Sequence, residues 1–224
     1  KFKISQDFFY LYYSVGDSDW QSVKANTEVE FGGSKGDLRL RGGNDKNKNT
    51  NGTCLSNITT TISFTENNVP VSCKGDIRTL IDWENYATVE TKDAKFSKLF
   101  YGCSVLTSAP DLPSKNLSSK CYYSMFYGCT GLTTAPALPA TVLANGCYAQ
   151  MFYGCTSLKS APALPATVLA ESCYKSMFRV CTLLDNASDL PAEKVPDNAY
   201  NEMFYECTSL KAMPTISAKT VNAY

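Results

Sequence analysis

The stretch CYAQMFYGCTSLKSAPALPATVLAES, residues 147–172, decides the fold of this chain because the segments on both sides repeat it. Residues 121–146 read CYYSMFYGCTGLTTAPALPATVLANG, and residues 173–198 read CYKSMFRVCTLLDNASDLPAEKVPDN. A fixed period of about 20 to 50 residues is the signature of a repeat architecture. Without insertion or deletion, the period of 26 predicts a solenoid of five coils, called rows from here on: 95–120, 121–146, 147–172, 173–198 and 199–224.

Three columns of this alignment never change: the sixth is always Phe, the ninth always Cys and the twelfth always Leu. Side chains that recur in every coil are those that stack on themselves inside a solenoid. We therefore expect a structural core made of Phe100, Phe126, Phe152, Phe178, Phe204, Cys103, Cys129, Cys155, Cys181, Cys207, Leu106, Leu132, Leu158, Leu184 and Leu210.

Each row divides into two arms. Columns 1, 2, 5, 6 and 9 are apolar, which is the spacing of one helical face and predicts a two-turn α-helix at the row start. The second arm, LKSAPALPA in the third row, carries two prolines that favour extended backbone and permit only a short parallel strand. The fold class expected is mixed α/β, a right-handed leucine-rich-repeat-like β/α solenoid.

Residues 1–94 lack the period and are predicted to form a separate small β domain. Alternating apolar segments separated by Gly, Asn and Asp clusters indicate about five antiparallel strands. The segments are LYYSV (11–15), TEVEF (27–31), DLRLR (37–41), ITTTISF (58–64) and VPVSC (69–73). The sequence GDIRTLIDWENYATV (75–89) suggests a short amphipathic helix that leads into the first coil.

Composition removes several classes of function. The 224 residues carry 21 basic and 21 acidic side chains, so no electrostatic footprint for nucleic acid or an anionic membrane is visible. No apolar run approaches the roughly 20 residues that span a bilayer. The chain has no His, which is the commonest general base and metal ligand at neutral pH. We expect no cofactor, no metal, no catalytic residue and a monomeric chain.

The ten cysteines could bind a metal, form disulfides or pack in the core. Paired cysteines eight residues apart, without His, do not match zinc spacing. Eight residues of helix separate the α-carbons by roughly 12 Å, beyond the ~7 Å that a disulfide spans. Bonds between rows stay open on geometry, but column 1 (Cys121, Cys147, Cys173) becomes Ala199 in the last row, which favours packing.

Outside the repeat, Cys54 and Cys73 flank the segment 58–73, and a disulfide between them is an open alternative.

Two sets of residues are candidates for ligand binding. Tyr127, Tyr153 and Tyr205 share column 7, where exposed Tyr suits sugar or protein contacts and buried Tyr would fasten coil to coil. Columns 13, 14 and 17 are polar and differ from row to row, as a binding surface would. Their candidates are Thr133, Thr134, Lys159, Ser160, Asp185, Asn186, Asp189 and Lys211. Asp185 and Asp189 are also the one carboxylate pair worth testing as a glycosidase site, and we expect them to be open to solvent.

The motif CYxxMFxGCTxLxxAPxLPA resembles the BspA-type leucine-rich repeats of surface proteins from gut Bacteroidetes, over residues 95–224. The segments LYYSVGDSDWQSV and LRLRGGN are similar to the β region that precedes such repeats. Where this chain has APALPA the family often has a β-branched IxIP strand, and the L-x-x-L-x-L-x-x-N pattern of other leucine-rich repeats is missing. The resemblance supplies no catalytic residue and no ligand identity.

The resemblance implies an exported, often lipid-anchored protein of the bacterial cell surface, with a role in adhesion or host-protein binding. Because the chain opens at Lys1 without a signal-type segment, we expect an amino-terminal anchor to have been lost. We therefore predict an extracellular, non-catalytic binding module that recognises a protein or glycan through the open face of the solenoid. A passive spacer is the alternative, and a glycan-processing enzyme is the third.

Overall fold

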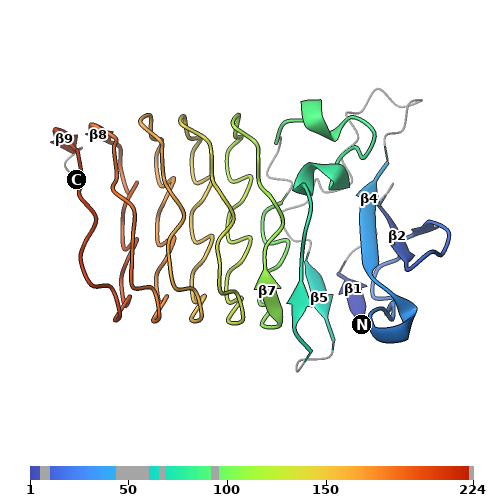
Figure 1. Ribbon diagram of the computed structural model, residues 1–224. Helices are drawn as coiled ribbons and strands as arrows, with labels where there is room; N and C mark the ends of the chain where they lie inside the picture. Colours follow the sequence, from blue (N-terminus) through green and yellow to red (C-terminus); the bar gives the residue numbers. More distant parts are fainter. Residues whose placement is uncertain (6–10, 44–60, 66–68, 92–95, 222–224) are drawn as a thin grey trace.

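The computed structural model describes residues 1–5, 11–43, 61–65, 69–91 and 96–221 (Figure 1). Its strands are β1 Phe2–Ile4, β2 Leu11–Val15, β3 Gln21–Ser22, β4 Leu38–Gly42, β5 Ile62–Phe64, β6 Val71–Ser72, β7 Leu106–Ser108, β8 Lys194–Val195 and β9 Thr220–Val221. Three short 3₁₀ helices accompany them: η1 Gly33–Lys35, η2 Ile77–Leu80 and η3 Tyr86–Thr88. Within these ranges the chain forms no α-helix.

The 26-residue rows lie side by side in sequence order, from the green row that contains β7 to the red row that ends in β9 (Figure 1). Backbone hydrogen bonds join each row to the next. The amide of Tyr122 donates to the carbonyl of Cys147 at 3.0 Å, and the amide of Gly128 donates to Tyr153 at 2.8 Å. Throughout columns 2, 4, 6 and 8, the amide of an even column donates to the carbonyl of the preceding odd column in the following row.

The odd columns of the row start use their amides differently. Met125 donates to Tyr122 and Tyr127 donates to Ser124, both at 3.2 Å, so the bonds run from residue i to i−3. The row start is thus a series of linked turns, columns 1–9, which we call the turn ribbon. The predicted two-turn helix is wrong, and with it the α part of the β/α assignment. Apolar columns 1, 2, 5, 6 and 9 follow a period of four, and over nine residues a period of four resembles 3.6.

The turn ribbon needs left-handed backbone at every fourth residue. Column 4 has φ of 50° at Ser124, 56° at Gln150 and 52° at Ser176. Column 8 has glycine in the first three rows, and in the fourth it has Val180 with φ of 62°. A β-branched residue in this region is strained, by about 1–3 kcal/mol.

Val180→Gly should therefore raise the free energy of unfolding, by about 1 kcal/mol or more, because glycine adopts positive φ without a steric cost. Urea denaturation of the two proteins measures the difference. The reverse change, Gly154→Val, places the same strain in the preceding row and should lower the free energy of unfolding by a similar amount. In an α-helix the first change would cost about 1 kcal/mol, so a loss of stability would contradict the turn ribbon.

The second arm of each row is extended and pairs only at points. Single parallel bridges join Ser108 to Thr134 and Ser160 to Asn186 in column 14, and Val142 to Val168 in column 22. Longer pairing occurs in β8–β9, which is also parallel. Proline lacks the amide that a ladder requires, which explains why the ladder is broken here.

The core of the stack is built from rings placed directly above one another. Phe100, Phe126, Phe152, Phe178 and Phe204 stack with neighbouring centroids 5.6 Å apart. Column 2 forms a second stack at 5.8–6.0 Å, from Phe96 to Tyr200. The Phe, Cys and Leu residues of columns 6, 9 and 12 are buried in the first four rows and partly exposed in the fifth.

Residues before the stack combine a small sheet with an irregular coil. Strands β3, β2 and β4 form an antiparallel sheet, and β1 pairs with β5 in antiparallel register. The segment 27–31 contributes one bridge, between Val29 and Phe2. Two expectations are corrected: β6 pairs in parallel with β7 of the first row, and the helix predicted over 75–89 is the pair η2 and η3.

The reason for the parallel pairing is that residues 61–65 and 69–91 run along the first row like an additional coil. The amide of Ile62 donates to Leu99 at 2.7 Å, and the amide of Asp111 donates to Gly75 at 2.9 Å. These bonds occupy backbone groups that the first row would otherwise leave unpaired.

Candidate functional site

Column 7 of the turn ribbon forms a continuous series of flat side chains, which we call the ladder: Tyr101, Tyr127, Tyr153, Arg179 and Tyr205. The rings of Tyr101 and Tyr127 are 4.7 Å apart, and those of Tyr127 and Tyr153 are 4.5 Å apart. The guanidinium carbon of Arg179 lies 5.7 Å from the Tyr153 ring and 4.5 Å from the Tyr205 ring. Arginine therefore continues the stack where the fourth row has no tyrosine.

Stacking decides which parts of the ladder a partner can reach. The inner rings cover each other's faces, so their edges and hydroxyl groups are what they present. Tyr101 and Tyr205 are more open, with 42% and 50% of their surface exposed. Burial raises the pKa of Tyr127, and the neighbouring Tyr153 and Tyr101 act in the same direction, so its hydroxyl stays protonated and can donate a hydrogen bond at neutral pH.

Charged groups accompany the ladder at two places along the stack, in the first row and where the fourth row meets the fifth. Glu202 forms an ion pair with Arg179, and the hydrogen bond between them raises the pKa of the arginine. The Ser176 hydroxyl lies 3.4 Å from the same carboxylate. At the first row the Lys98 ammonium lies 5.7 Å from the Tyr101 ring and 5.9 Å from the Tyr123 ring. The surface therefore combines aromatic edges, hydroxyls and two cations.

The variable columns lie on the extended arm instead. Asp185 is half-exposed, and the others are exposed: Thr133, Thr134, Lys159, Ser160, Asn186, Asp189 and Lys211. Several of their polar groups bond to the adjacent row. Lys211 pairs with Asp185 at 2.8 Å, Asp189 accepts from the Thr215 amide at 2.9 Å, and the Thr133 hydroxyl donates to the Thr107 carbonyl at 3.3 Å. Among the described residues, no hydrogen bond, ion pair or ring contact joins these columns to the ladder.

Asp185 and Asp189 do not have the electrostatics of a glycosidase pair. A general acid needs a raised pKa, whereas the hydrogen bond and charge of Lys211 hold the pKa of Asp185 below its ordinary value. Asp189 is exposed and already accepts a backbone amide. Each carboxylate serves as a tie between two rows.

The cysteines of column 9 do more than fill space. The thiol of Cys129 donates to the Phe100 carbonyl at 3.0 Å, Cys155 donates to Phe126 at 3.1 Å, and Cys181 donates to Phe152 at 3.0 Å. Burial raises the pKa of the Cys103 thiol to about 12 and the pKa of Cys155 well above its ordinary value. Protonated thiols of this kind are poor nucleophiles.

In column 1, Cys121, Cys147 and Cys173 are fully buried, and burial raises the pKa of Cys121 to about 12. Cys54 lies outside the described residues, so its proposed bond to Cys73 stays a prediction. Cys73 is half-buried, and burial raises its pKa to about 11.

Thiol labelling at pH 8 should follow this pattern. A pKa of about 11 leaves roughly 0.1% thiolate at pH 8, against roughly a quarter for an ordinary cysteine. Cys207, which is half-buried with a pKa of about 11, should react faster than Cys155 in native protein. Mass spectrometry after timed alkylation measures both. In urea without reductant the thiols of both columns should all react, and two or fewer reactive thiols would contradict the packing role.

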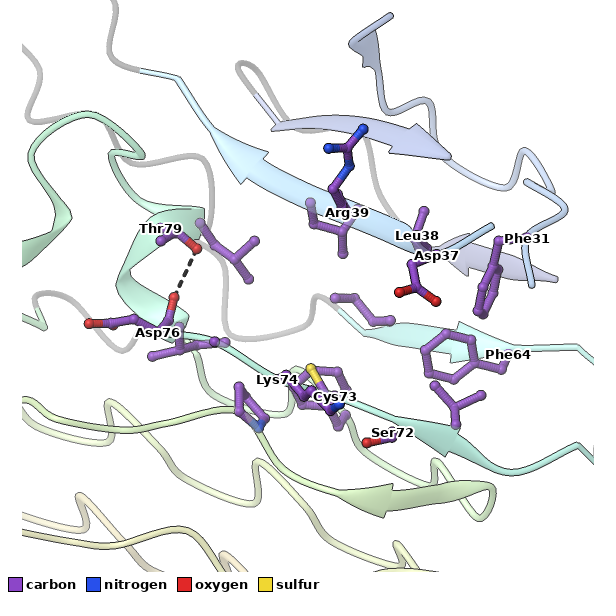
Figure 2. A pocket seen from close by; sticks show the side chains of 18 residues that line it. Phe31, Asp37, Leu38, Arg39, Phe64, Ser72, Cys73, Lys74, Asp76 and Thr79 are labelled. Atoms are coloured by element: carbon purple, nitrogen blue, oxygen red, sulfur yellow. Dashed lines mark hydrogen bonds between the residues drawn. The ribbon is translucent and has the colours of Figure 1, made fainter. Parts of the chain in front are cut away.

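A cavity of about 460 Å³ lies among β4, β5, β6 and η2 (Figure 2). Phe31 and Phe64 form part of its apolar wall, with ring centroids 5.8 Å apart. Two of its charged groups have partners in the protein, because Asp76 pairs with Arg78 at 2.7 Å and Arg39 bonds to the Ser14 hydroxyl at 3.0 Å. No sequence pattern pointed to this cavity.

Sequence reasoning also missed Arg179, although its place in the tyrosine column was a usable signal. In the described part of the chain, no three His, Cys, Asp or Glu side chains gather as metal ligands would. None of its helices has the length and apolar character to cross a membrane. Comparisons with known protein families, with characterised proteins and with solved structures find no match to this chain.

Proposed function

We propose that this protein is a BspA-type leucine-rich-repeat solenoid of the bacterial cell surface that binds an extracellular protein or glycan without catalysing a reaction. The proposal is supported by the repeat motif and by the stacking of its rows in register. The single observation that carries it is the ladder, an aromatic and cationic surface that continues across all five rows.

The ladder is a better binding surface than the variable columns of the extended arm. Tyr and Arg are enriched at the hot spots of protein interfaces, because they combine large apolar area with polar donors. On the extended arm, Lys211 and Asp189 already bond to the neighbouring row. A partner that used them would first have to replace those bonds, as one that used Arg179 would have to replace its ion pair with Glu202, so the tyrosines carry the preference for the ladder.

The geometry of the ladder suggests how a partner lies on it. Its rings recur every 4.5–4.7 Å along the stack. An extended peptide or sugar chain that runs in the same direction would meet a hydroxyl or a guanidinium at each row. Since the ring faces are already covered, the contacts would be hydrogen bonds to the hydroxyl groups and packing against ring edges.

An array of matrix proteins and glycans tests the proposal. Tyr127→Phe together with Tyr153→Phe keeps the stacked rings and removes two hydroxyls, so it should weaken binding at least tenfold without changing stability much. Lys159→Ala together with Ser160→Ala alters the extended arm of the row that contains Tyr153 and should leave binding unchanged. If the second pair weakens binding and the first does not, the binding surface is the extended arm.

A passive spacer is the second candidate, and one observation favours it. Exposed charges on the extended arm pair from row to row, as Lys211 does with Asp185 and Lys219 does with Glu193 at 2.6 Å. Such ion pairs join neighbouring rows and stiffen the stack without requiring a binding partner. Absence of saturable binding to any array member by folded protein would support the spacer.

A further inference from the structure

A cluster outside the stack joins both tryptophans of the chain to one arginine. The guanidinium carbon of Arg41 lies 4.1 Å from the centre of the Trp20 ring and 4.5 Å from that of Trp83. Tyr12 lies further away, at 6.0 Å. We call this group the arginine clamp: Tyr12, Trp20, Arg41 and Trp83.

Antiparallel register places one half of the clamp. Tyr12 of β2 is directly opposite Arg41 of β4, so both side chains project from the same face of the sheet. Trp20 directly precedes β3, which pairs with β2 on its other side. Arg39, two residues before Arg41 on that face, lies 5.7 Å from the Trp20 ring. The sheet therefore brings two cations to one indole.

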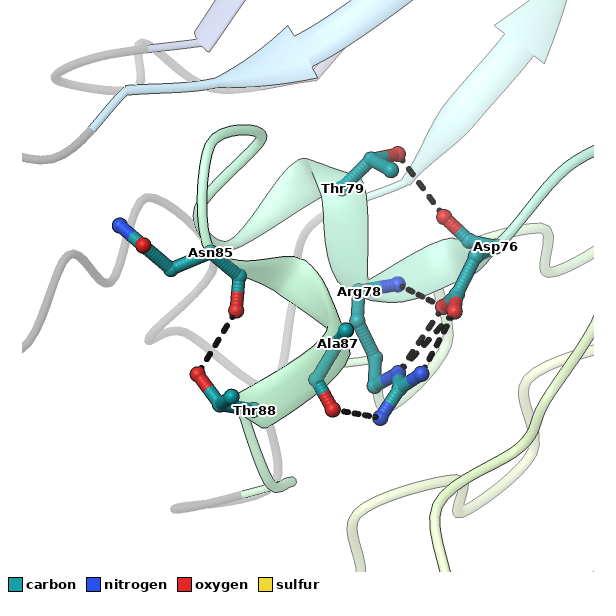
Figure 3. Close-up of polar contacts among 6 residues, drawn as sticks. All are labelled: Asp76, Arg78, Thr79, Asn85, Ala87 and Thr88. Carbon is teal, nitrogen blue, oxygen red and sulfur yellow. Dashed lines mark hydrogen bonds and ion pairs between the residues drawn. The ribbon is translucent and has the colours of Figure 1, made fainter.

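The segment between η2 and η3 carries the other half. Trp83 donates its amide to the Gly42 carbonyl at 3.2 Å, which fastens it to the end of β4. Figure 3 shows how the flanking turns are held: Arg78 pairs with Asp76 at 2.7 Å and donates to the Ala87 carbonyl at 3.2 Å. Such contacts hold the backbone on both sides of Trp83 in place before any ligand arrives.

Among the described residues, the arginine of the clamp has no polar partner. Its Nε is buried and makes no hydrogen bond. Within the described residues no hydrogen bond or ion pair is found for the rest of its guanidinium either. The two indole rings lie close to its guanidinium but cannot accept the in-plane N–H donors. A buried donor without an acceptor costs about 1–3 kcal/mol, which calls for an explanation.

We propose that the arginine clamp binds a carboxylate carried on a sugar ring, such as a hexuronic acid. A carboxylate accepts two parallel hydrogen bonds in the plane of a guanidinium, and the two terminal nitrogens of Arg41 are the donors open to it, since Nε is buried. The side chain of Arg41 is only half-buried, so a ligand can reach it. Trp83 keeps 42% of its surface exposed, and an apolar ring surface of this size suits the carbon face of a sugar.

An acidic peptide fits less well. An Asp or Glu side chain would satisfy Arg41 but would leave the exposed part of Trp83 uncovered.

The test is a titration of the full chain with tetragalacturonic acid, in which tryptophan fluorescence and calorimetry measure binding. Neutral cellotetraose and a hexaglutamate peptide are the matched probes. We expect saturable binding of the acidic sugar, weakened at least tenfold by Arg41→Lys, which keeps the charge but removes the two-pronged donor. Trp83→Ala should weaken the acidic sugar as strongly. Lys211→Ala, on the stack, should have no effect.

Several results would overturn the proposal. Equal binding of the neutral sugar would remove the role of the carboxylate, and tighter binding of hexaglutamate would make the site one for acidic peptide. No saturable binding of tetragalacturonic acid, or unchanged binding in Arg41→Lys, would also overturn it. Circular dichroism and urea denaturation show whether each variant is folded. If Trp83→Ala does not fold, Trp83→Phe replaces it in the test. The ladder variants leave this site intact, so its failure and that of the ladder can be told apart.

Discussion

Phe152→Ala should lower the free energy of unfolding by about 3–5 kcal/mol, the largest loss expected from one side chain of the stack. Phe152 is fully buried and stacks on Phe126 and on Phe178, with centroids 5.6 Å away on both sides. Its removal leaves a cavity between two layers that cannot close, because backbone bonds between rows fix their separation. Urea denaturation followed by circular dichroism measures the loss.

Phe204→Ala is the matched control. Phe204 has the same column and the same stacking distance to Phe178, but it lies in the last row, where it is half-buried and has one ring neighbour. The Phe204→Ala variant should lose clearly less free energy of unfolding than Phe152→Ala, on the order of half as much. In a stack of repeats each unit contacts only its neighbours, so position along the stack should set the cost. Equal losses would contradict the layered core.

Gly42→Ala should destabilise the amino-terminal part by more than the ~1–3 kcal/mol typical of an overpacked site. A Cβ at this position would lie 2.0 Å from the Leu80 carbonyl oxygen and 3.0 Å from that of Ile81. Both obstacles are backbone, so relief requires η2 to move away from β4. Because the Gly42 carbonyl also accepts the Trp83 amide, tryptophan fluorescence should shift along with stability.

Gly102→Ala is the matched control for Gly42→Ala, because it restricts the backbone of a glycine without creating a steric clash. Gly102 has φ of 72° and no heavy atom within 4 Å of a Cβ added there, so the change should cost only about 1 kcal/mol. It should also leave tryptophan emission as it is. If Gly42→Ala costs no more than Gly102→Ala, β4 and η2 are not in the close contact described.

The period of 26 located the buried columns from sequence alone, because a side chain that must stack on its own copy cannot vary. That is why Phe126, Cys129 and Leu132 could be assigned to the interior before any coordinates were considered. The same reasoning could not separate helix from turn ribbon. Gly102, Gly128 and Gly154 at column 8 were the available clue, since glycine adopts positive φ without a steric cost.

Contacts between distant segments were beyond sequence reasoning. The arginine clamp unites positions 20, 41 and 83 through sheet register and one close approach at Gly42, and no local pattern encodes either. The parallel pairing of β6 with β7 was missed for a related reason. Alternating apolar residues predict a strand but not the direction of its partner.

The turn ribbon also gives the stack an electrostatic direction. Each peptide group that links an odd column to the next even column turns its N–H toward the following row and its C=O toward the preceding one. Their dipoles therefore add along the stack, as those of an α-helix do along its axis. Column 4 carries Lys98 at the carbonyl end and Glu202 at the amide end, and Glu206 follows at column 8. The charges at the two ends thus oppose the field of the backbone, and each added row would lengthen that dipole.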